Sequence, residues 1–267
     1  MNSLRKFRPL HSQNRMRHEG DLKSARRDFL ESDNRNLKFL LNFRFKWIDA
    51  YINEFDKGLE LGAGIGASAL ILENAKVELS DLADNPWLDH KNVDALDTGF
   101  ADSSYDYVIA SNMVHHVAIP SQFFREVARI TKPGGLLILN EANTSLLSKI
   151  ILIAMRHEGF DDEAKVFDPE YICNDPTDPW SANCSIPRLL FDAPKKFEES
   201  FPEWEIVHDS KHEFFLFINS GGVTAKFFHI PLSEYGLRLV ATIDSFLVKL
   251  APNIFALGRR TVLKKRG

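Results

Sequence analysis

The sequence predicts an α/β protein with a doubly wound, mostly parallel sheet, and two observations support this fold class. Between residues 57 and 141, short apolar runs typical of buried strands alternate with helical patterns. The first run ends abruptly at three alternating glycines, Gly62, Gly64 and Gly66. The 267 residues, 44% hydrophobic and 26% charged, are enough for one large domain or for a domain with a sizeable insertion.

The N-terminal segment, residues 1–54, is predicted to be an arm followed by a helical extension. Residues 1–20 have no hydrophobic periodicity, so we expect a loose arm there. Between residues 22 and 55, apolar side chains recur at helical spacing, and Asp33 or Asn34 is suited to cap a helix. We expect this extension to lie over the sheet or over the mouth of a ligand site.

Residues 57–66, K-G-L-E-L-G-A-G-I-G, predict a strand and a tight glycine loop, and residues 67–74 predict the helix that follows. Glycines allow backbone conformations with positive φ and let a ligand approach the main chain closely. The start of the helix would offer unpaired N–H groups beside that ligand. A nucleotide-type cofactor is the natural occupant of such a loop.

The next eighty residues supply four more strands, over residues 76–81, 91–95, 104–110 and 136–141, and a helix. Residues 76–81 predict a strand that ends on Asp81, and only a short turn separates it from residues 91–95. Residues 104–110 predict a buried strand that is followed by the loop S-N-M-V-H-H-V. Pro120 starts a helix, and Pro133 with Gly134 stops it before a strand over residues 136–141.

The pattern changes after the fifth strand. Residues 143–156 predict a strongly apolar helix, and residues 157–187, rich in Asp, Pro and Asn, predict an ordered loop. A helical stretch, a strand from residue 204, a helix over residues 232–250 and a terminal strand follow. We therefore expect residues 55–267 to form one domain with a substrate-lid insertion at about 143–200 and a helical insertion at about 220–256.

Two cofactors compete for the glycine loop. With the spacing Gly62-x-Gly64-x-x-Ala67, and with Asp81 about 20 residues later, the loop fits the fingerprint of an NAD(P)-dependent oxidoreductase. With the spacing Glu60-x-Gly62-x-Gly64-x-Gly66, it resembles motif I of the S-adenosylmethionine-dependent methyltransferases. The loop alone does not decide between them.

Four segments in a fixed order carry a resemblance to the class I S-adenosylmethionine-dependent methyltransferases, in particular the broad family that acts on small molecules. They are E-L-G-A-G-I-G, the strand that ends on Asp81, V-D-A-L…S-Y-D-Y-V-I-A-S, and H-H-V…F-F-R-E-V-A-R-I-T-K-P-G-G-L-L-I-L-N-E. The resemblance implies a Rossmann-like seven-stranded sheet whose last strand, T-V-L-K-K, is antiparallel. It also implies S-adenosyl-L-methionine as the cofactor.

The resemblance implies a set of cofactor-binding residues. Asp81 would accept hydrogen bonds from both ribose hydroxyls, and Asp94 would accept one from the adenine amine, with Leu82 and Ala95 against the ring faces. Glu60 would orient the glycine loop, and Ser111 with Asn112 would meet the amino-acid end of the cofactor. The full set is Glu60, Gly62, Ala63, Gly64, Gly66, Asp81, Leu82, Asp94, Ala95, Ser111 and Asn112.

Methyl transfer from a sulfonium is an in-line displacement, so the protein mainly has to align the acceptor and exclude water. A general base is needed only where the acceptor is protonated at neutral pH. The candidates are His115, His116, Glu141 and His157, which follow the fourth and fifth strands or begin the insertion. No metal is predicted, because the two cysteines of the chain match no zinc-binding spacing.

The predicted acceptor is a small molecule or a glycan or lipid intermediate. A net charge of −4 and the lack of an aromatic-basic platform make nucleic acid an unlikely partner. The apolar helix over residues 232–250, with Arg259, Arg260 and Lys264, suggests either core packing, a dimer seam or peripheral membrane contact. Few cysteines and no apolar signal sequence predict a cytoplasmic protein. A non-catalytic S-adenosylmethionine-binding module remains the third functional alternative.

Overall fold

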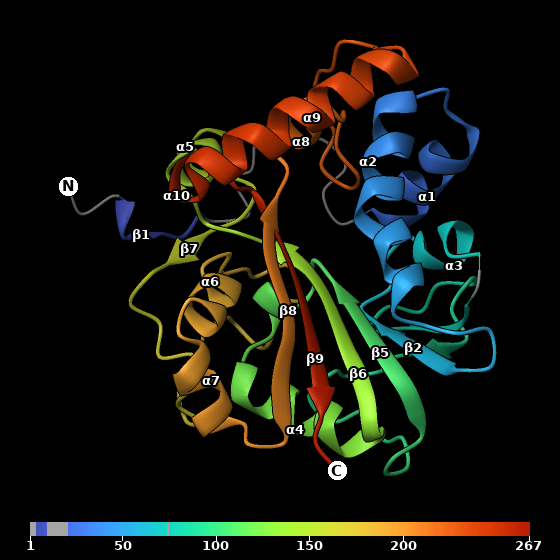
Figure 1. Cartoon of the computed structure of the whole chain (residues 1–267), viewed down its shortest axis with the longest axis vertical. Helices are drawn as coiled ribbons and strands as arrows, with labels where there is room; N and C mark the ends of the chain where they lie inside the picture. Colours follow the sequence, from blue (N-terminus) through green and yellow to red (C-terminus); the bar gives the residue numbers. More distant parts are fainter. Residues whose placement is uncertain (1–3, 10–20, 74) are drawn as a thin grey trace.

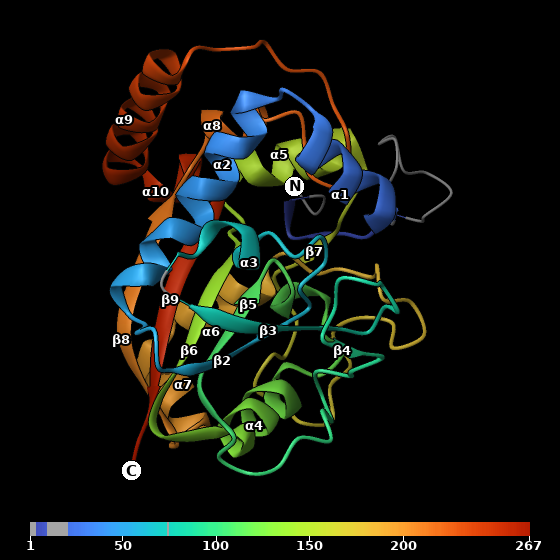
Figure 2. The same cartoon turned by 90° about the vertical axis from the view of Figure 1, so that its right-hand side faces the viewer.

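A computed structural model describes residues 4–9, 21–73 and 75–267. Its centre is a seven-stranded sheet with the strand order β4-β3-β2-β5-β6-β9-β8 (Figure 1, with β3 and β4 labelled in Figure 2). In that order the strands are His90–Lys91, Lys76–Asp81, Lys57–Leu61, Tyr105–Ser111, Thr131–Ala142, Gly258–Lys265 and Trp204–His212. The pairs from β4 to β6 are parallel, and β9 is antiparallel to both of its neighbours. The predicted mostly parallel sheet with an antiparallel last strand is confirmed.

Alternating side chains of the central strands enter two separate cores. On one face, Val108 and Leu137 pack with helices α4 (Pro120–Ile130), α6 (Ile186–Phe191) and α7 (Pro194–Ser200). On the other face, Ile109 and Ile138 pack with helices from the N-terminal part of the chain. A parallel strand that is buried on both faces needs apolar residues at consecutive positions, which is the pattern that predicted these strands.

The N-terminal helices cover the second face. They are α1 (Leu22–Glu31), α2 (Arg35–Phe45) and the 3-10 helix η3 (Lys46–Ala50), joined there by α3 (Ser68–Ile71). Asn34 caps α2, because its side-chain oxygen accepts a hydrogen bond of 3.1 Å from the Leu37 N–H. The helix predicted over residues 67–74 is confined to the single turn of α3.

Further helices gather beyond the carboxyl ends of the parallel strands, as Figures 1 and 2 show. They are α5 (Leu146–Met155), α8 (Phe215–Ile218), α9 (Glu234–Leu250) and α10 (Pro252–Phe255), and the 3-10 helix η4 (Val114–His116) follows β5. Leu216 of α8 and Leu237 of α9 pack against Leu40 of α2. Within the described ranges, no helix combines the length and the apolar character needed to cross a membrane. The domain boundaries and the cytoplasmic location stay predictions.

The structure corrects the prediction of a loose N-terminal arm. Strand β1 (Lys6–Phe7) pairs with β7 (Phe160–Asp161) of the insertion, and the Lys6 ammonium lies 2.7 Å from the buried Asp161 carboxylate. The arm is therefore anchored at residues 4–9, whereas residues 10–20 lie outside the described part of the chain.

The structure also corrects the suggested role of Arg259 and Arg260 in membrane contact. Arg259 is only 2% exposed, and its guanidinium pairs with Asp192 and Asp209 at 2.7 and 2.6 Å. Arg260 is half-buried and donates a hydrogen bond to the Phe43 carbonyl. The structure therefore excludes these two charges from contact with a membrane surface, whereas peripheral contact through the helix over residues 232–250 stays a prediction.

Candidate active site

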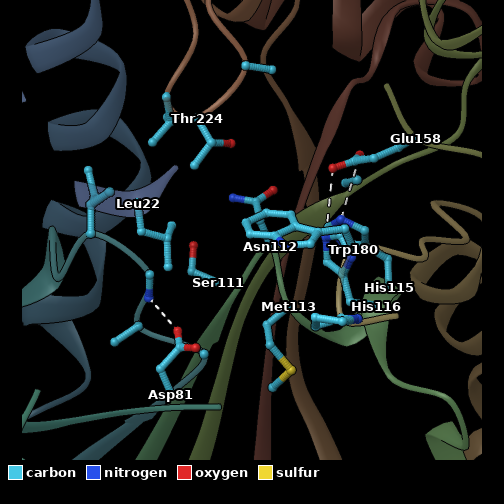
Figure 3. Close-up of a pocket in the computed structure, with 18 of the residues that line it drawn as sticks. Leu22, Asp81, Ser111, Asn112, Met113, His115, His116, Glu158, Trp180 and Thr224 are labelled. Atoms are coloured by element: carbon cyan, nitrogen blue, oxygen red, sulfur yellow. Dashed lines mark hydrogen bonds and ion pairs between the residues drawn. The ribbon is translucent and has the colours of Figure 1, made fainter. Parts of the chain in front are cut away.

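A cavity of about 770 Å³ opens at the carboxyl ends of β2, β3 and β5, where doubly wound sheets bind their ligands. One end of its wall is the glycine loop with Asp81, and the opposite end holds the histidines that follow β5 (Figure 3). Helices α1, α2 and α5, the insertion and the loop around Thr224 close the remaining sides. The volume lies within the range of about 300–1,000 Å³ that is usual for small-molecule sites.

The glycine loop is held from outside the cavity. The Trp87 indole N–H donates a hydrogen bond of 2.9 Å to the Gly64 carbonyl, and the Arg26 guanidinium donates one to the Ile65 carbonyl. Arg26 also lies 4.9 Å from the centroid of the Trp87 ring. Gly64 has φ +53°, and a Cβ atom there would meet nothing nearer than Leu22 at 3.9 Å. The loop therefore leaves open space on its cavity side.

Two carboxylates lie beside this loop. Asp81 accepts hydrogen bonds of 2.8 Å from the Gly64 N–H and 2.9 Å from the Ala83 N–H, one on each oxygen, so each oxygen keeps accepting capacity. Glu60 is buried and accepts a hydrogen bond from the Ser68 hydroxyl at the start of α3. Burial, together with the nearby negative charge of Asp81, raises the pKa of Glu60 to about 8.

Most residues predicted for the cofactor line this end of the cavity. Those in the wall are Glu60, Gly62, Ala63, Gly64, Asp81, Leu82, Asp94, Ala95, Ser111 and Asn112. Gly66 is not among them. It has φ +68°, and its N–H closes the loop on the Ala63 carbonyl at 2.7 Å. The set fits S-adenosylmethionine, because no residue in the described part of the chain pairs a cation with buried Glu60, and the amino group of the cofactor can supply one.

The opposite end of the cavity is built around His115, which is 1% exposed. Its Nδ1 atom lies 2.6 Å from Oε2 of Glu141. The other oxygen of Glu141 accepts hydrogen bonds of 2.8 Å from the N–H groups of Met113 and Val114. Glu141 itself is absent from the cavity wall. It fixes the orientation of His115 from behind, while His115, His116 and His157 line the cavity.

Glu158 completes this cluster and was missed by the sequence analysis. Its carboxylate lies 3.7 Å from Nε2 of both His115 and His116, and 3.3 Å from Nε2 of His157. The Cys184 thiol donates a hydrogen bond of 3.1 Å to it. The signal available in the sequence was the adjacency of Glu158 to His157 at the start of the insertion.

The electrostatics of the two neighbouring histidines differ. Burial alone would lower the pKa of His115, but the Glu141 and Glu158 carboxylates outweigh it and raise that pKa to about 10. Burial and the neighbouring His115 lower the pKa of His116 to about 4. Their rings lie 4.3 Å apart between centroids, so two positive charges there would repel strongly.

The insertion closes over these histidines. The Asn183 N–H and the Asn174 amide each donate a hydrogen bond of 2.8 Å to the His115 carbonyl. Trp180 lies edge-on to the His116 ring with 6.4 Å between centroids and lines the cavity (Figure 3). Asn183 is buried, and its side-chain oxygen accepts a hydrogen bond of 2.8 Å from the Asp161 N–H.

The strand order, the antiparallel β9 and the acid at the end of β3 beside a glycine loop define a class I S-adenosylmethionine-dependent methyltransferase core. Residues 59–139 match the family described as a methyltransferase domain. This part of the chain therefore forms a methyltransferase domain, and the cofactor of that class is S-adenosylmethionine. The NAD(P) alternative for the glycine loop is not supported.

Three proteins illustrate what this chain is similar to. An uncharacterized methyltransferase of Mycobacterium avium is 35% identical over 95 residues, which are 31% of this chain and 38% of that protein. A hybrid PKS-NRPS synthetase of Fusarium is 32% identical over 114 residues, which are 34% of this chain but 3% of that protein. A crystal structure of a SAM dependent methyltransferase from Archaeoglobus fulgidus has a TM-score of 0.53 and 17% identity, covering 90% of this chain and 97% of that one. The chain thus spans well under half the length of these two sequence relatives, and the structural likeness concerns the fold.

Proposed function

We propose that this chain is an active S-adenosylmethionine-dependent methyltransferase whose acceptor is a small molecule with an ionisable group. One observation carries the proposal: a single cavity joins the glycine loop and Asp81 at one end to a cluster of histidines and acids at the other. Transfer requires cofactor and acceptor in one space that excludes water. A binding module without activity would not need the second, chemically equipped end.

At the cofactor end, the residues in the cavity wall match the parts of S-adenosylmethionine. Asp81 would accept hydrogen bonds from the ribose hydroxyls with the capacity left on its oxygens, and Asp94 would accept one from the adenine amine. Leu82 and Ala95 would contact the ring, and Glu60 would face the cationic amino group. When bound, the cofactor supplies a methyl group that its sulfonium has already activated.

At the acceptor end, His115 and Glu141 form a dyad suited to proton transfer. Glu141 holds Nδ1 of His115, so Nε2 is directed at the cavity and, when deprotonated, would take the proton from an acceptor O–H or N–H group. Because the pKa of His115 is about 10, the deprotonated form becomes more abundant as the pH rises, and methyl transfer should accelerate with it. Glu141 is thereby a positioning residue, and His115 is the proposed base. His116 and His157 would line the same acceptor subsite.

The size and the walls of the cavity support a small acceptor. A volume of about 770 Å³ has to hold the cofactor and the acceptor together. Ile151, Leu152 and Met155 of α5 contribute an apolar wall near the histidines, and the insertion with Trp180 covers them. A small acceptor with an apolar body and one ionisable group matches this wall better than a glycan or a long lipid intermediate does.

Calorimetric titration with S-adenosylmethionine, S-adenosylhomocysteine and NAD tests the cofactor end. We expect the first two to bind and Asp81→Ala to weaken them about 10- to 150-fold, since a hydrogen bond to a charged group contributes about 1.5–3 kcal/mol. Asp84→Ala is the matched control, because Asp84 is exposed in the same loop and pairs with Lys91 at 2.8 Å. Binding of NAD alone would contradict the proposal, and so would equal affinity for S-adenosylmethionine in the wild type, Asp81→Ala and Asp84→Ala.

A labelled-methyl assay on a panel of hydroxylated and aminated small molecules tests the activity. We expect transfer to at least one member by the wild type and at least about a hundredfold slower transfer by His115→Gln, the usual lower bound for general base catalysis. Undiminished transfer by the variant would exclude His115 as the base.

A further inference from the structure

We propose that His115, His116 and Glu158 form a binding site for one divalent transition-metal ion at the acceptor end of the cavity. Binding of the ion depends only on these side chains. Its role in holding and deprotonating the acceptor rests on the proposed function and refines it. The ion would lower the pKa of the bound acceptor, and His115 would act as a ligand of the ion instead of as the base.

The three side chains surround a gap (Figure 3). Nε2 of His115 and Nε2 of His116 each lie 3.7 Å from one oxygen of Glu158, which is too long for a hydrogen bond. One potential ligand atom from each residue lies within 4.8 Å of the other two. Ligand atoms about 2.1 Å from a tetrahedral zinc ion stand about 3.4 Å apart, so a small inward rotation of these side chains brings them into range.

Each imidazole has an oxygen partner on its Nδ1 atom, and this leaves the lone pair of its Nε2 atom directed at the gap. Nδ1 of His115 faces the Glu141 carboxylate at 2.6 Å, and Nδ1 of His116 faces the Ser181 carbonyl at 3.2 Å. A carbonyl oxygen can only accept, so the proton of His116 belongs on Nδ1 and leaves Nε2 free to bind a cation. Histidines that bind metals almost always have such an oxygen partner on their other nitrogen.

The donor set and the local charge select the class of ion. Two carboxylates, Glu141 and Glu158, lie against His115 and so favour a cation in the gap. Imidazole and carboxylate ligands together suit Zn²⁺, Fe²⁺ or Co²⁺, whereas Mg²⁺ prefers oxygen ligands alone. Three protein ligands leave a coordination position open, which is the arrangement of catalytic rather than structural sites.

The open coordination position of the ion would bind the acceptor and direct it toward the cofactor end of the cavity. An acceptor hydroxyl that binds there would have its pKa lowered, so that the O–H bond breaks, its electron pair stays on oxygen and the proton passes to water. The oxygen then forms a bond to the methyl carbon while the carbon–sulfur bond breaks, with that electron pair leaving on sulfur. Charge and atoms balance without an oxidant or a reductant.

Titration of the chelator-treated, untagged full chain with Co²⁺ tests the site. We expect one Co²⁺ per chain, a visible d–d absorption band, displacement by Zn²⁺ and no displacement by Mg²⁺. Glu158→Gln should weaken binding at least about a hundredfold, and Glu141→Gln about 10- to 100-fold, as expected for a group that holds a ligand from behind. Glu163→Gln is the matched control, because this exposed carboxylate belongs to the same insertion and lies 3.8 Å from Arg5.

Thermal unfolding of each variant checks that loss of binding is not loss of folding. Failure of folded wild-type protein to bind Co²⁺, or binding by Glu158→Gln as tight as that of the wild type, would overturn the proposal. Methyl transfer that is unaffected by chelation, in a chain that does not bind Co²⁺, would overturn the metal site and leave the proposed function standing. Specific Co²⁺ binding by a chain that does not bind S-adenosylmethionine would support the metal site and contradict the proposed function.

Discussion

Replacing Gly64 by alanine separates the strain of a tight loop from the space that the loop leaves for a ligand. Gly64 has φ +53°, and its added Cβ would meet nothing closer than Leu22 at 3.9 Å, on the cavity side of the loop. The left-handed conformation costs an alanine roughly 1–2 kcal/mol. For a chain of this size that corresponds to a fall in Tm of about 2–8 °C. The methyl group would also occupy the place where the cofactor approaches the main chain.

Gly134→Ala is the matched control for this substitution. Gly134 has φ +79°, nothing lies within 4 Å of an added Cβ, and the residue is remote from the cavity. We expect both variants to lose similar stability in thermal unfolding, while only Gly64→Ala weakens S-adenosylmethionine in calorimetry, by at least about tenfold, or about 1.4 kcal/mol. Equal cofactor affinity in the two variants would refute the placement of the cofactor against Gly64.

Three further predictions concern groups around the cavity. Glu60 has a raised folded-state pKa, so its contribution to stability is full below about 4.5 and declines as the pH rises to about 8; urea unfolding should show this slope, and Glu60→Gln should abolish it. Arg44 pairs with Glu213 in the buried wall at 3.0 Å, so Arg44→Met should cost about 3–5 kcal/mol in urea unfolding, and adding Glu213→Gln should recover part of it. Trp87→Phe removes the hydrogen bond to the Gly64 carbonyl and should cost about 0.5–1.5 kcal/mol and weaken the cofactor several-fold; unchanged affinity would mean that the loop needs no such support.

The sequence was informative where local pattern and structure coincide. The strand that ends at Leu61, the glycines and Asp81 at the end of β3 all follow from short apolar runs and from turn residues with positive φ. The seven-stranded sheet and its antiparallel last strand followed from the family resemblance. A few dozen consecutive residues were therefore enough to predict both the glycine loop and Asp81 as part of one site.

The missing parts depend on contacts between distant segments. Glu158 meets His115 only because the insertion folds back over the loop after β5, held by the bonds of Asn174 and Asn183 to the His115 carbonyl. Nothing periodic in the insertion indicates that return. Arg259 appeared to be a solvent-exposed basic residue, although Asp192 and Asp209, 67 and 50 residues away, neutralise it inside the fold. Such pairing has no local signal.

A crystal structure of the full chain with S-adenosylhomocysteine tests the central claim most directly, namely that one cavity joins a cofactor end to an acceptor end. The account predicts the ribose at Asp81, the amino group toward Glu60 and the sulfur atom facing the part of the cavity lined by His115 and His116. A cofactor bound with its sulfur directed away from these histidines, or bound outside the cavity, would contradict it.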